Sequence, residues 1–188
     1  MQALEEKLDR LQKGDILILA GSIPASLAQT TYERILARLE GRDIRAVVDA
    51  TRDLLVNVLR YKPFLIKPNN HELSEIAGVK LTNDNEIVTA ARMMQAKGAR
   101  NVLVSMAGDG ALLLDEQGGV HRIGCPKGKV VNSVGAGDSM VAGFVAGYQQ
   151  SGGDYAAALK LGTACGSATA FSLGLATKAD IDKLLKTM

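Results

Sequence analysis

The segment with the clearest chemical meaning joins a glycine-rich turn to an acidic residue. It consists of Gly135, Ala136, Gly137 and Asp138, and the spacing that follows predicts a helix over 137–150. Small residues let a ligand approach the backbone, and the N–H groups at a helix start attract anions such as phosphate. An aspartate would repel phosphate there, so Asp138 fits a base that takes a proton from an attacking hydroxyl. The alternative is a helix cap, because aspartate is a favoured capping residue.

A second cluster, Lys67-Pro-Asn-Asn-His-Glu72, follows a predicted buried strand over 63–67. Asn69 and Glu72 are three positions apart at a helix start, so their side chains could share one face. Amide and carboxylate oxygens suit Mg²⁺, and Lys67 could neutralise a phosphoryl group during transfer. The alternative for Asn69 and Glu72 is a capping box, in which the two side chains satisfy helix N–H groups.

Two further loops carry weaker signals. The loop after the predicted strand 101–105 contains Ser105, Met106, Ala107, Gly108, Asp109 and Gly110. It could line a nucleotide or form a turn between two strands. Gly21 and Ser22 follow the first predicted strand, where ordinary loop chemistry is a sufficient explanation. Cys125 and Cys165 match no metal or redox spacing, and we expect Cys165 to lie in the core.

Strand-like and helix-like segments alternate along the chain and would position these clusters. Buried strands are predicted over 15–21, 45–49, 63–67, 101–105 and 110–115, and an edge strand over 120–124. Helices are predicted over 4–11, 30–40, 54–60, 72–77, 85–97, 137–150, 155–171 and 179–186. This alternation predicts an α/β fold, with helices on both faces of a mainly parallel sheet and an antiparallel hairpin around 116–119. Because ligands bind at the carboxyl ends of such strands, we expect the clusters to share one rim.

Composition excludes several classes of protein. The 188 residues are 47% hydrophobic and 22% charged, which predicts one compact domain over 1–188. No apolar run approaches the roughly 18 residues of a membrane span, and the start lacks a secretory signal, so we expect a cytoplasmic protein without a membrane partner. A net charge of +2, 4% aromatic residues and no tryptophan argue against a nucleic-acid partner.

Four motifs in order carry a resemblance to a known family. They are Gly-Ser-Ile-Pro, Lys-Pro-Asn-x-x-Glu, Ser-x-x-Gly-x-Gly and Gly-Ala-Gly-Asp. Together they resemble the ribokinase-like (PfkB) carbohydrate kinases, which implies a three-layer α/β/α core, ATP and Mg²⁺ as cofactors, and a small sugar phosphate as substrate. Segments 63–73 and 132–144 are most similar to members that convert fructose 1-phosphate to fructose 1,6-bisphosphate, with tagatose 6-phosphate as a neighbouring substrate.

The resemblance also implies roles for single residues. Asp138 would be the base that deprotonates the sugar hydroxyl, and the N–H groups of Gly135, Ala136 and Gly137 would form an anion hole. Asn69 and Glu72 would organise Mg²⁺, partly through water, and Lys67 would contact ATP phosphates. The nucleotide would be bordered by Ser105, Met106, Ala107, Gly108, Asp109 and Gly110. Gly21 and Ser22 would lie near the phosphorylated sugar.

The resemblance covers only the C-terminal part of the family, so the expected core lacks the N-terminal strands and the lid. An unpaired apolar sheet edge would then favour self-association, and a homo-oligomer is expected. Two alternatives remain beside the fructose 1-phosphate kinase. One is a kinase of this family with another sugar or a nucleoside as acceptor, and the other is a non-catalytic nucleotide-binding remnant.

Overall fold

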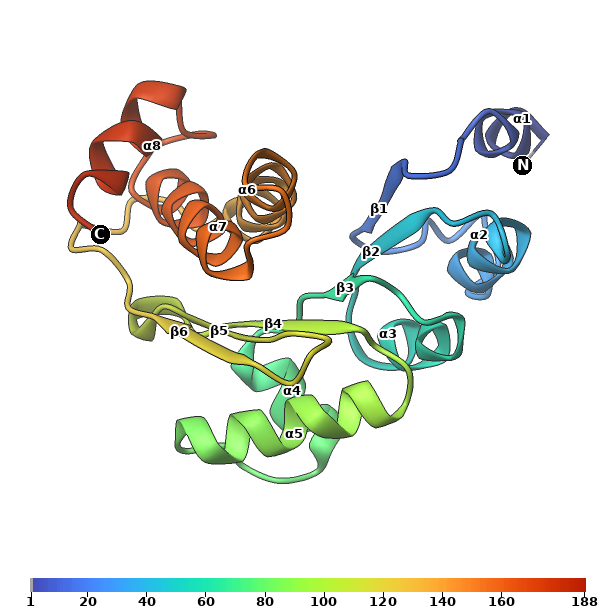
Figure 1. Ribbon diagram of the computed structural model, residues 1–188, viewed down its shortest axis with the longest axis horizontal. Coiled ribbons are helices and arrows are strands. Elements are labelled where there is room, and N and C mark those ends of the chain that lie inside the picture. The colour runs from blue at the N-terminus through green and yellow to red at the C-terminus, as the bar shows by residue number, and fades with distance from the viewer. Residues whose placement is uncertain (1) are drawn as a thin grey trace. The chain divides into compact units, whose positions relative to one another are not determined.

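The computed structural model describes residues 2–188, in which helices and strands alternate (Figure 1). The strands are β1 (Ile16–Ala20), β2 (Arg45–Asp49), β3 (Leu65–Ile66), β4 (Asn101–Ser105), β5 (Ala111–Leu114) and β6 (Val120–Ile123). The helices are α1 (Gln2–Asp9), α2 (Thr31–Leu39), α3 (Arg52–Val58), α4 (Asn70–Ala77), α5 (Asp84–Ala96), α6 (Ala136–Gln150), α7 (Tyr155–Ala170) and α8 (Lys178–Leu185). Two short 3-10 turns, η1 (Leu59–Tyr61) and η2 (Ala107–Asp109), complete the order.

Hydrogen bonds join the strands in the order β1–β2–β3–β4–β5–β6. The pairs β1–β2, β2–β3 and β3–β4 are parallel, whereas β5 and β6 form an antiparallel hairpin. The predicted α/β class, the mainly parallel sheet and the hairpin are therefore confirmed. β3 is shorter than the predicted 63–67, since prolines at 63 and 68 flank it and proline has no N–H to donate to a neighbouring strand.

By its internal contacts the chain divides into two compact units, Met1–Val102 and Leu103–Met188. We call them the N-terminal unit and the C-terminal unit and describe each by itself. The expectation of one domain over the whole chain stays a prediction. In the N-terminal unit, each of the helices α1 to α5 packs against the next in chain order, and β1, β2 and β3 pair with one another. Its core includes the fully buried side chains of Leu55, Phe64, Leu65, Ile66 and Leu73.

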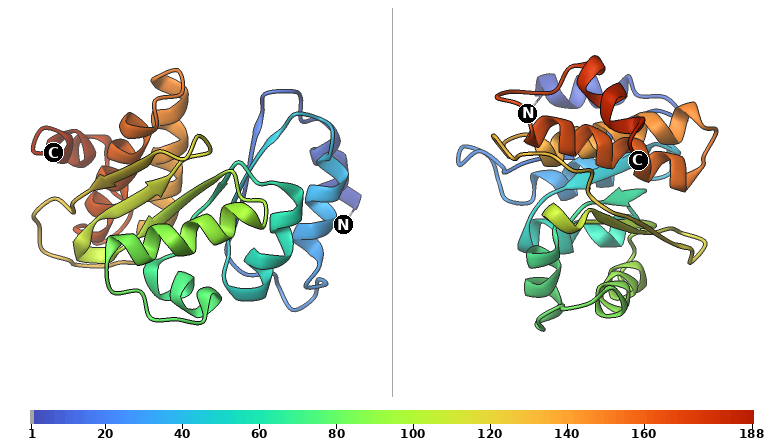
Figure 2. Two further views of the ribbon diagram at one scale, coloured as in Figure 1. Left: turned by 60° about the horizontal axis from the view of Figure 1, so that its bottom comes forward. Right: turned by 90° about the vertical axis from the view of Figure 1, so that its left-hand side faces the viewer.

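In the C-terminal unit, α6 and α7 lie side by side, and α7 covers the β5–β6 hairpin (Figure 2). The close approach of α6 and α7 depends on small residues. A Cβ added at Gly143 would lie 2.6 Å from the Cys165 sulfur, and one at Gly162 would lie 2.9 Å from the Met140 carbonyl oxygen. Cys165 is buried, as predicted, and burial raises the pKa of its thiol. The small-residue segment of α7 is therefore a helix-packing face.

Strand β1 corrects one expectation, because it was predicted to be fully buried. Leu19 is buried, but Ile18 is 42% exposed. Among the described strands, β1 stands at one end of the sheet order with β2 as its one neighbour, so fewer elements surround it than surround a central strand. An apolar strand sequence indicates burial only when both its edges and both its faces are covered.

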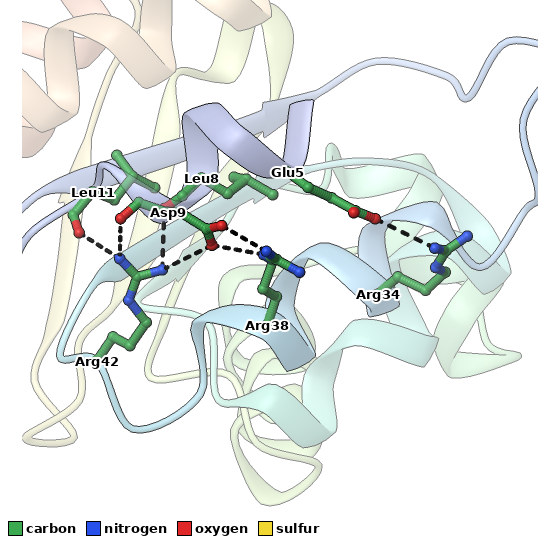
Figure 3. Close-up of polar contacts among 7 residues, drawn as sticks. All are labelled: Glu5, Leu8, Asp9, Leu11, Arg34, Arg38 and Arg42. Carbon is green, nitrogen blue, oxygen red and sulfur yellow. Dashed lines mark hydrogen bonds and ion pairs between the residues drawn. The ribbon is translucent and has the colours of Figure 1, made fainter. Parts of the chain in front are cut away.

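Helix α1 is held to α2 by arginines that follow one another at helical spacing (Figure 3). Arg38 donates two hydrogen bonds to the Asp9 carboxylate, at 2.8 and 2.6 Å. Arg42, just beyond α2, donates to the carbonyl oxygens of Leu8, Asp9 and Leu11. Leu8 and Asp9 are the last residues of α1, and Leu11 follows it. The Leu8 carbonyl oxygen also accepts from the Leu11 N–H at 3.2 Å. Arg42 therefore caps α1 from the neighbouring segment and holds the chain that leads into β1.

Candidate active site

The carboxyl ends of β1, β2 and β3 are level with one another in the N-terminal unit. Ala20 is the register partner of Asp49, and Val48 is the partner of Ile66. The Gly21 N–H donates to the Asp49 carbonyl oxygen at 3.0 Å, and the Lys67 N–H donates to the Val48 carbonyl oxygen at 3.3 Å. The parallel register thus brings two of the predicted site residues, Gly21 and Lys67, to the same edge.

Lys67 is buried although it carries an ammonium group, with 6% of the residue exposed. Its Nζ lies 3.2 Å from the Asp49 Oδ2, and the two side chains are 7% and 18% exposed. A lysine is rarely buried this far without a counter-charge, because removing an ammonium group from water is costly. From the sequence, Lys67 is predicted to contact phosphate groups, and Asp49 has no predicted role. The pairing of the two side chains follows only from the folded sheet.

Tyr32 on α2 fixes the chain that follows β1. Its hydroxyl donates to the carbonyl oxygens of Ala20, at 2.8 Å, and Gly21, at 3.2 Å. Burial and the nearby Asp49 carboxylate raise the pKa of Tyr32, which keeps its proton available for donation. Gly21 has a φ of +84°, a conformation that glycine adopts without strain. Gly21 and Ser22 are exposed, so this held turn can be reached by a ligand.

Asn69 and Glu72 form the capping box that was the alternative to a metal site. The Asn69 Oδ1 accepts from the Glu72 N–H at 2.9 Å, and the Glu72 Oε2 accepts from the Asn69 N–H at 2.8 Å. These bonds leave the second carboxylate oxygen of Glu72, which is half-buried, for a ligand. One hard oxygen beside coordinated water is a fit for Mg²⁺. The capping reading is confirmed, and the Mg²⁺ role stays a prediction.

The loop from Ser105 to Gly110 is a tight turn in the C-terminal unit. The Met106 N–H donates to the Gly110 carbonyl oxygen at 2.8 Å, and the Gly110 N–H donates to the Ala107 carbonyl oxygen at 3.1 Å. Gly110 has a φ of +91°, and a Cβ there would lie 2.1 Å from the Ile123 carbonyl oxygen. Met106 is buried, so the exposed surface of this loop comes from 107–109. The turn reading is confirmed, and the nucleotide role stays a prediction.

The start of α6 presents backbone donors. Gly135 is the N-cap with a φ of +78°, and the Ala136 N–H donates to the Ser133 carbonyl oxygen at 3.2 Å. Within residues 2–188 the N–H groups of Gly135, Gly137 and Asp138 have no hydrogen-bond acceptor. Since Gly135 holds the capping position, the helix-cap alternative for Asp138 is wrong. Asp138 is exposed in the first turn, and its carboxylate has no hydrogen bond or ion pair in the described part of the chain.

Two loops beside this helix start form an apolar surface that sequence reasoning missed. The Ala170 carbonyl oxygen accepts from the N–H groups of Val131 and Asn132, and the Asn132 side-chain amide donates to the Leu173 carbonyl oxygen. Large aliphatic side chains on the tied loops are exposed: Val130, Val131, Val134, Leu173 and Leu175. Leu175 reaches the helix start, because a Cβ on Gly135 would lie 2.9 Å from its Cδ2. The sequence signal was weak, since the loops are far apart along the chain.

The described residues contain no group of three or more histidine, cysteine, aspartate or glutamate side chains placed to hold a metal ion. Among the helices of residues 2–188, none is long and apolar enough to cross a membrane. His71 is exposed on α4, whereas His121 hydrogen-bonds to Asp115 in the β5–β6 hairpin. The expectation that all clusters share one rim stays a prediction, since each unit is described separately.

Comparison with known sequences defines the class of protein. The sequence pattern of the pfkB family of carbohydrate kinases matches residues 1–182, so the chain belongs to this family. The predicted family resemblance is thereby confirmed.

The names of individual relatives specify a substrate more closely than the family name does. A 1-phosphofructokinase of Bacillus subtilis is 46% identical over 184 residues, which are 98% of this chain and 60% of the relative. A D-tagatose-1-phosphate kinase of Bacillus licheniformis is 36% identical over 99% of this chain and 60% of the relative. The crystal structure of phosphofructokinase-2 from Escherichia coli with substrates and products is 28% identical, with a TM-score of 0.91 over 99% of this chain and 61% of that one. The chain therefore spans about 60% of the length of the proteins it matches.

Proposed function

We propose that this chain forms the nucleotide-binding and base-bearing part of an ATP-dependent kinase that converts fructose 1-phosphate to fructose 1,6-bisphosphate. The observation that carries the proposal is the start of α6, where the N–H groups of Gly135, Gly137 and Asp138, which have no acceptor in residues 2–188, adjoin the exposed carboxylate of Asp138. Donors of this kind bind anions, and a carboxylate beside them suits a base rather than a second anion ligand. Similarity to a 1-phosphofructokinase over 98% of the chain supports the choice of acceptor.

In the proposed reaction Asp138 accepts the proton of the C6 hydroxyl as the hydroxyl oxygen attacks the γ-phosphorus of ATP. The new oxygen–phosphorus bond forms while the bond between the γ-phosphorus and the ADP oxygen breaks. The N–H groups of Gly135 and Gly137, together with that of Asp138, donate to phosphoryl oxygens, where negative charge is concentrated during transfer. The Ala136 N–H already donates to Ser133, so it joins the anion hole only if that 3.2 Å bond opens.

The N-terminal unit supplies positive charge and a metal ligand in this proposal. Lys67 contacts a phosphate oxygen with its ammonium group, and Gly21 and Ser22 lie against the phosphorylated sugar. Glu72 would hold Mg²⁺ with the carboxylate oxygen that the capping box leaves open, and Asn69 would keep Glu72 oriented through that box. When bound, Mg²⁺ neutralises charge on the phosphate oxygens of ATP.

The tied loops 130–134 and 170–176 offer a place for the nucleotide base. Their exposed aliphatic side chains include Val134 and Leu175, which are 77% and 73% exposed. A flat aromatic base would remove such surface from water while the attached phosphates bind to the start of α6. The 107–109 turn would border the nucleotide from the same unit.

Tagatose 1-phosphate is a second candidate acceptor, because one relative is named for that activity at 36% identity. Tagatose 1-phosphate and fructose 1-phosphate differ only in the configuration at C4. The same base and anion-binding groups would therefore serve both, and discrimination would depend on contacts to the C4 hydroxyl.

The test is ADP release by the purified chain with Mg-ATP and one acceptor at a time. Fructose 1-phosphate is compared with tagatose 1-phosphate, tagatose 6-phosphate, fructose 6-phosphate and ribose. The proposal expects the highest kcat/KM with fructose 1-phosphate. A higher kcat/KM with another sugar would make that sugar the acceptor in place of fructose 1-phosphate. A chain that binds ADP in a calorimetric titration but turns over no sugar would be a nucleotide-binding remnant.

We also propose that the chain self-associates through the open edge of β1. Ile18 exposes an aliphatic side chain on a strand that has one hydrogen-bonded neighbour. Light scattering should find dimers or larger species at micromolar concentration, and Ile18→Lys should shift them toward the monomer. A monodisperse wild-type monomer would contradict this part of the proposal.

A further inference from the structure

The ion pair between Lys67 and Asp49 differs from the other lysine pairs of the described chain in its burial. The Lys67 and Asp49 side chains are 7% and 18% exposed, whereas Lys13 and Asp43, at 3.0 Å, are 83% and 69% exposed. The pair lies at the end of strands whose adjoining residues are fully buried: Val47, Val48, Leu65 and Ile66. Water therefore does little to screen the attraction between its charges.

Such a pair is poorly explained as a source of stability. Removing two charges from water offsets most of their attraction, and well-packed apolar residues often serve a fold as well. Its place in the fold is more informative. Asp49 is the last residue of β2 and Lys67 follows β3, so both stand where ligands bind in open α/β sheets.

Asp49 also reaches the neighbouring strand through its backbone. Its carbonyl oxygen accepts from the Gly21 N–H, and Tyr32 holds the Gly21 carbonyl oxygen from the other side. One residue thus contacts both the turn proposed for the sugar phosphate and the lysine proposed for ATP. The carboxylate is directed to the lysine and the carbonyl to the turn.

We propose that Asp49 is a positioning residue whose carboxylate holds the Lys67 ammonium extended at the end of β3, where it can meet a phosphoryl oxygen. This inference rests on the proposed kinase function for its consequence, but the placement of Lys67 by Asp49 can be tested without turnover. Asp49 acts through Lys67 and not on the reacting atoms. Removing its charge should therefore alter the transfer step more than ligand affinity.

The first test measures how fast Lys67 reacts with an amine-acylating reagent, followed by peptide mass spectrometry of the purified chain. Asp49→Asn removes the counter-charge and keeps the side-chain shape. The acylation rate of Lys67 should rise at least tenfold, since the ammonium is no longer held in the buried pair. Asp43→Asn, which breaks the exposed pair with Lys13, is the matched control and should leave Lys67 unchanged. Amide exchange of Val48 and Ile66 should stay within threefold, which separates release of the lysine from opening of the sheet.

The second test is a double-mutant cycle on turnover, with active sites counted by ADP titration. Asp49→Asn should lower kcat at least tenfold while the KM values for ATP and the sugar phosphate stay within threefold. In a Lys67→Met background the same change should have little further effect, and Asp49→Glu should restore part of the rate.

An unchanged Lys67 acylation rate, or losses that are additive in the cycle, would overturn the role of Asp49. Failure of the proposed function has a different signature, because the wild-type chain would then release no ADP with any sugar phosphate. In that case the acylation rates still decide whether Asp49 places Lys67.

Discussion

Lys67 in the N-terminal unit and Asp138 in the C-terminal unit are charged groups in opposite surroundings. Lys67 is 6% exposed and paired with the half-buried carboxylate of Asp49, whereas Asp138 is exposed and has no bonded partner in residues 2–188. The same contrast holds for the backbone, since Gly21 is held on both sides while the N–H groups of Gly137 and Asp138 have no acceptor. The region around Lys67 and Gly21 is held by internal bonds before a ligand binds. The start of α6 has donors and a carboxylate that remain available to a ligand.

The contrast follows from the elements that carry the two groups. The end of a parallel strand is flanked by neighbouring strands, so a side chain there is surrounded by residues that can hold it. The first turn of a helix has N–H groups that the helix itself cannot satisfy. The end of a parallel strand therefore suits a lysine whose side chain has to be held in one position. The first turn of a helix suits a site that binds an anion.

The largest expected effect concerns the open region. Asp138→Asn should lower turnover by about 10²- to 10⁴-fold, since an amide cannot accept the hydroxyl proton, while ADP affinity stays similar. Steady-state kinetics and calorimetry measure the two quantities. Asp180→Asn is the matched control, because Asp180 holds the same position in the first turn of α8. An unchanged rate in Asp138→Asn would remove the base from the proposal.

The second prediction asks whether the C-terminal unit has a rigid part of its own. Gly110→Ala should lower the free energy of unfolding by at least about 2 kcal/mol, because the position has positive φ and the methyl group would meet the Ile123 carbonyl oxygen. Gly108→Ala is the control, since nothing lies within 4 Å of its Cβ position and its φ is not positive. Urea denaturation of both variants decides. Equal stability would show that this turn is adaptable.

Two capping boxes allow a comparison at the level of single helices. Asn69→Ala in α4 and Thr177→Ala in α8 each remove a cap, and each should cost about 1 kcal/mol of stability. Only Asn69→Ala should also raise the Mg²⁺ concentration needed for half-maximal turnover, since it releases the orientation of Glu72. If both variants leave the Mg²⁺ requirement unchanged, the box on α4 is structural alone.

The smallest expected effect is a pH dependence of stability. It concerns Asp115, an acid of the C-terminal unit that has hydrogen-bond partners, in contrast to Asp138. Burial raises the pKa of Asp115, but hydrogen bonds from His121, Gly119 and Gln117 outweigh it and hold the pKa below the usual 3.8. A lowered folded-state pKa stabilises the fold above the unfolded value. That stability is lost as the pH falls below about 4 and through the folded-state pKa.

His121→Gln should reduce the loss of unfolding free energy on acidification, because one of the bonds that lower the pKa of Asp115 is weakened. Urea midpoints from pH 6 down to pH 3 measure it. Parallel curves for wild type and variant would show that the backbone donors hold the carboxylate alone.

Much of the fold could be predicted because its signals are local. The observed bounds of most elements lie within two residues of the predicted ranges, since apolar runs, helix spacing and glycines act over a few neighbouring positions. The same holds for the capping box, in which Asn69 and Glu72 bond across three residues. The burial of Cys165 followed from the small residues around it on one helix.

The sequence by itself determined which elements form and which residues stand at their ends. Only the tertiary structure decided that Asp49 faces Lys67, that Tyr32 holds Gly21, that Ile18 is exposed and that Leu175 reaches the start of α6. These four depend in turn on strand register, on the docking of α2, on the order of strands in the sheet and on the hydrogen bonds that tie the loop after α7 to residues 131 and 132. Such contacts join residues distant in the chain, and their geometry is set by the packing of whole elements, which no local pattern encodes.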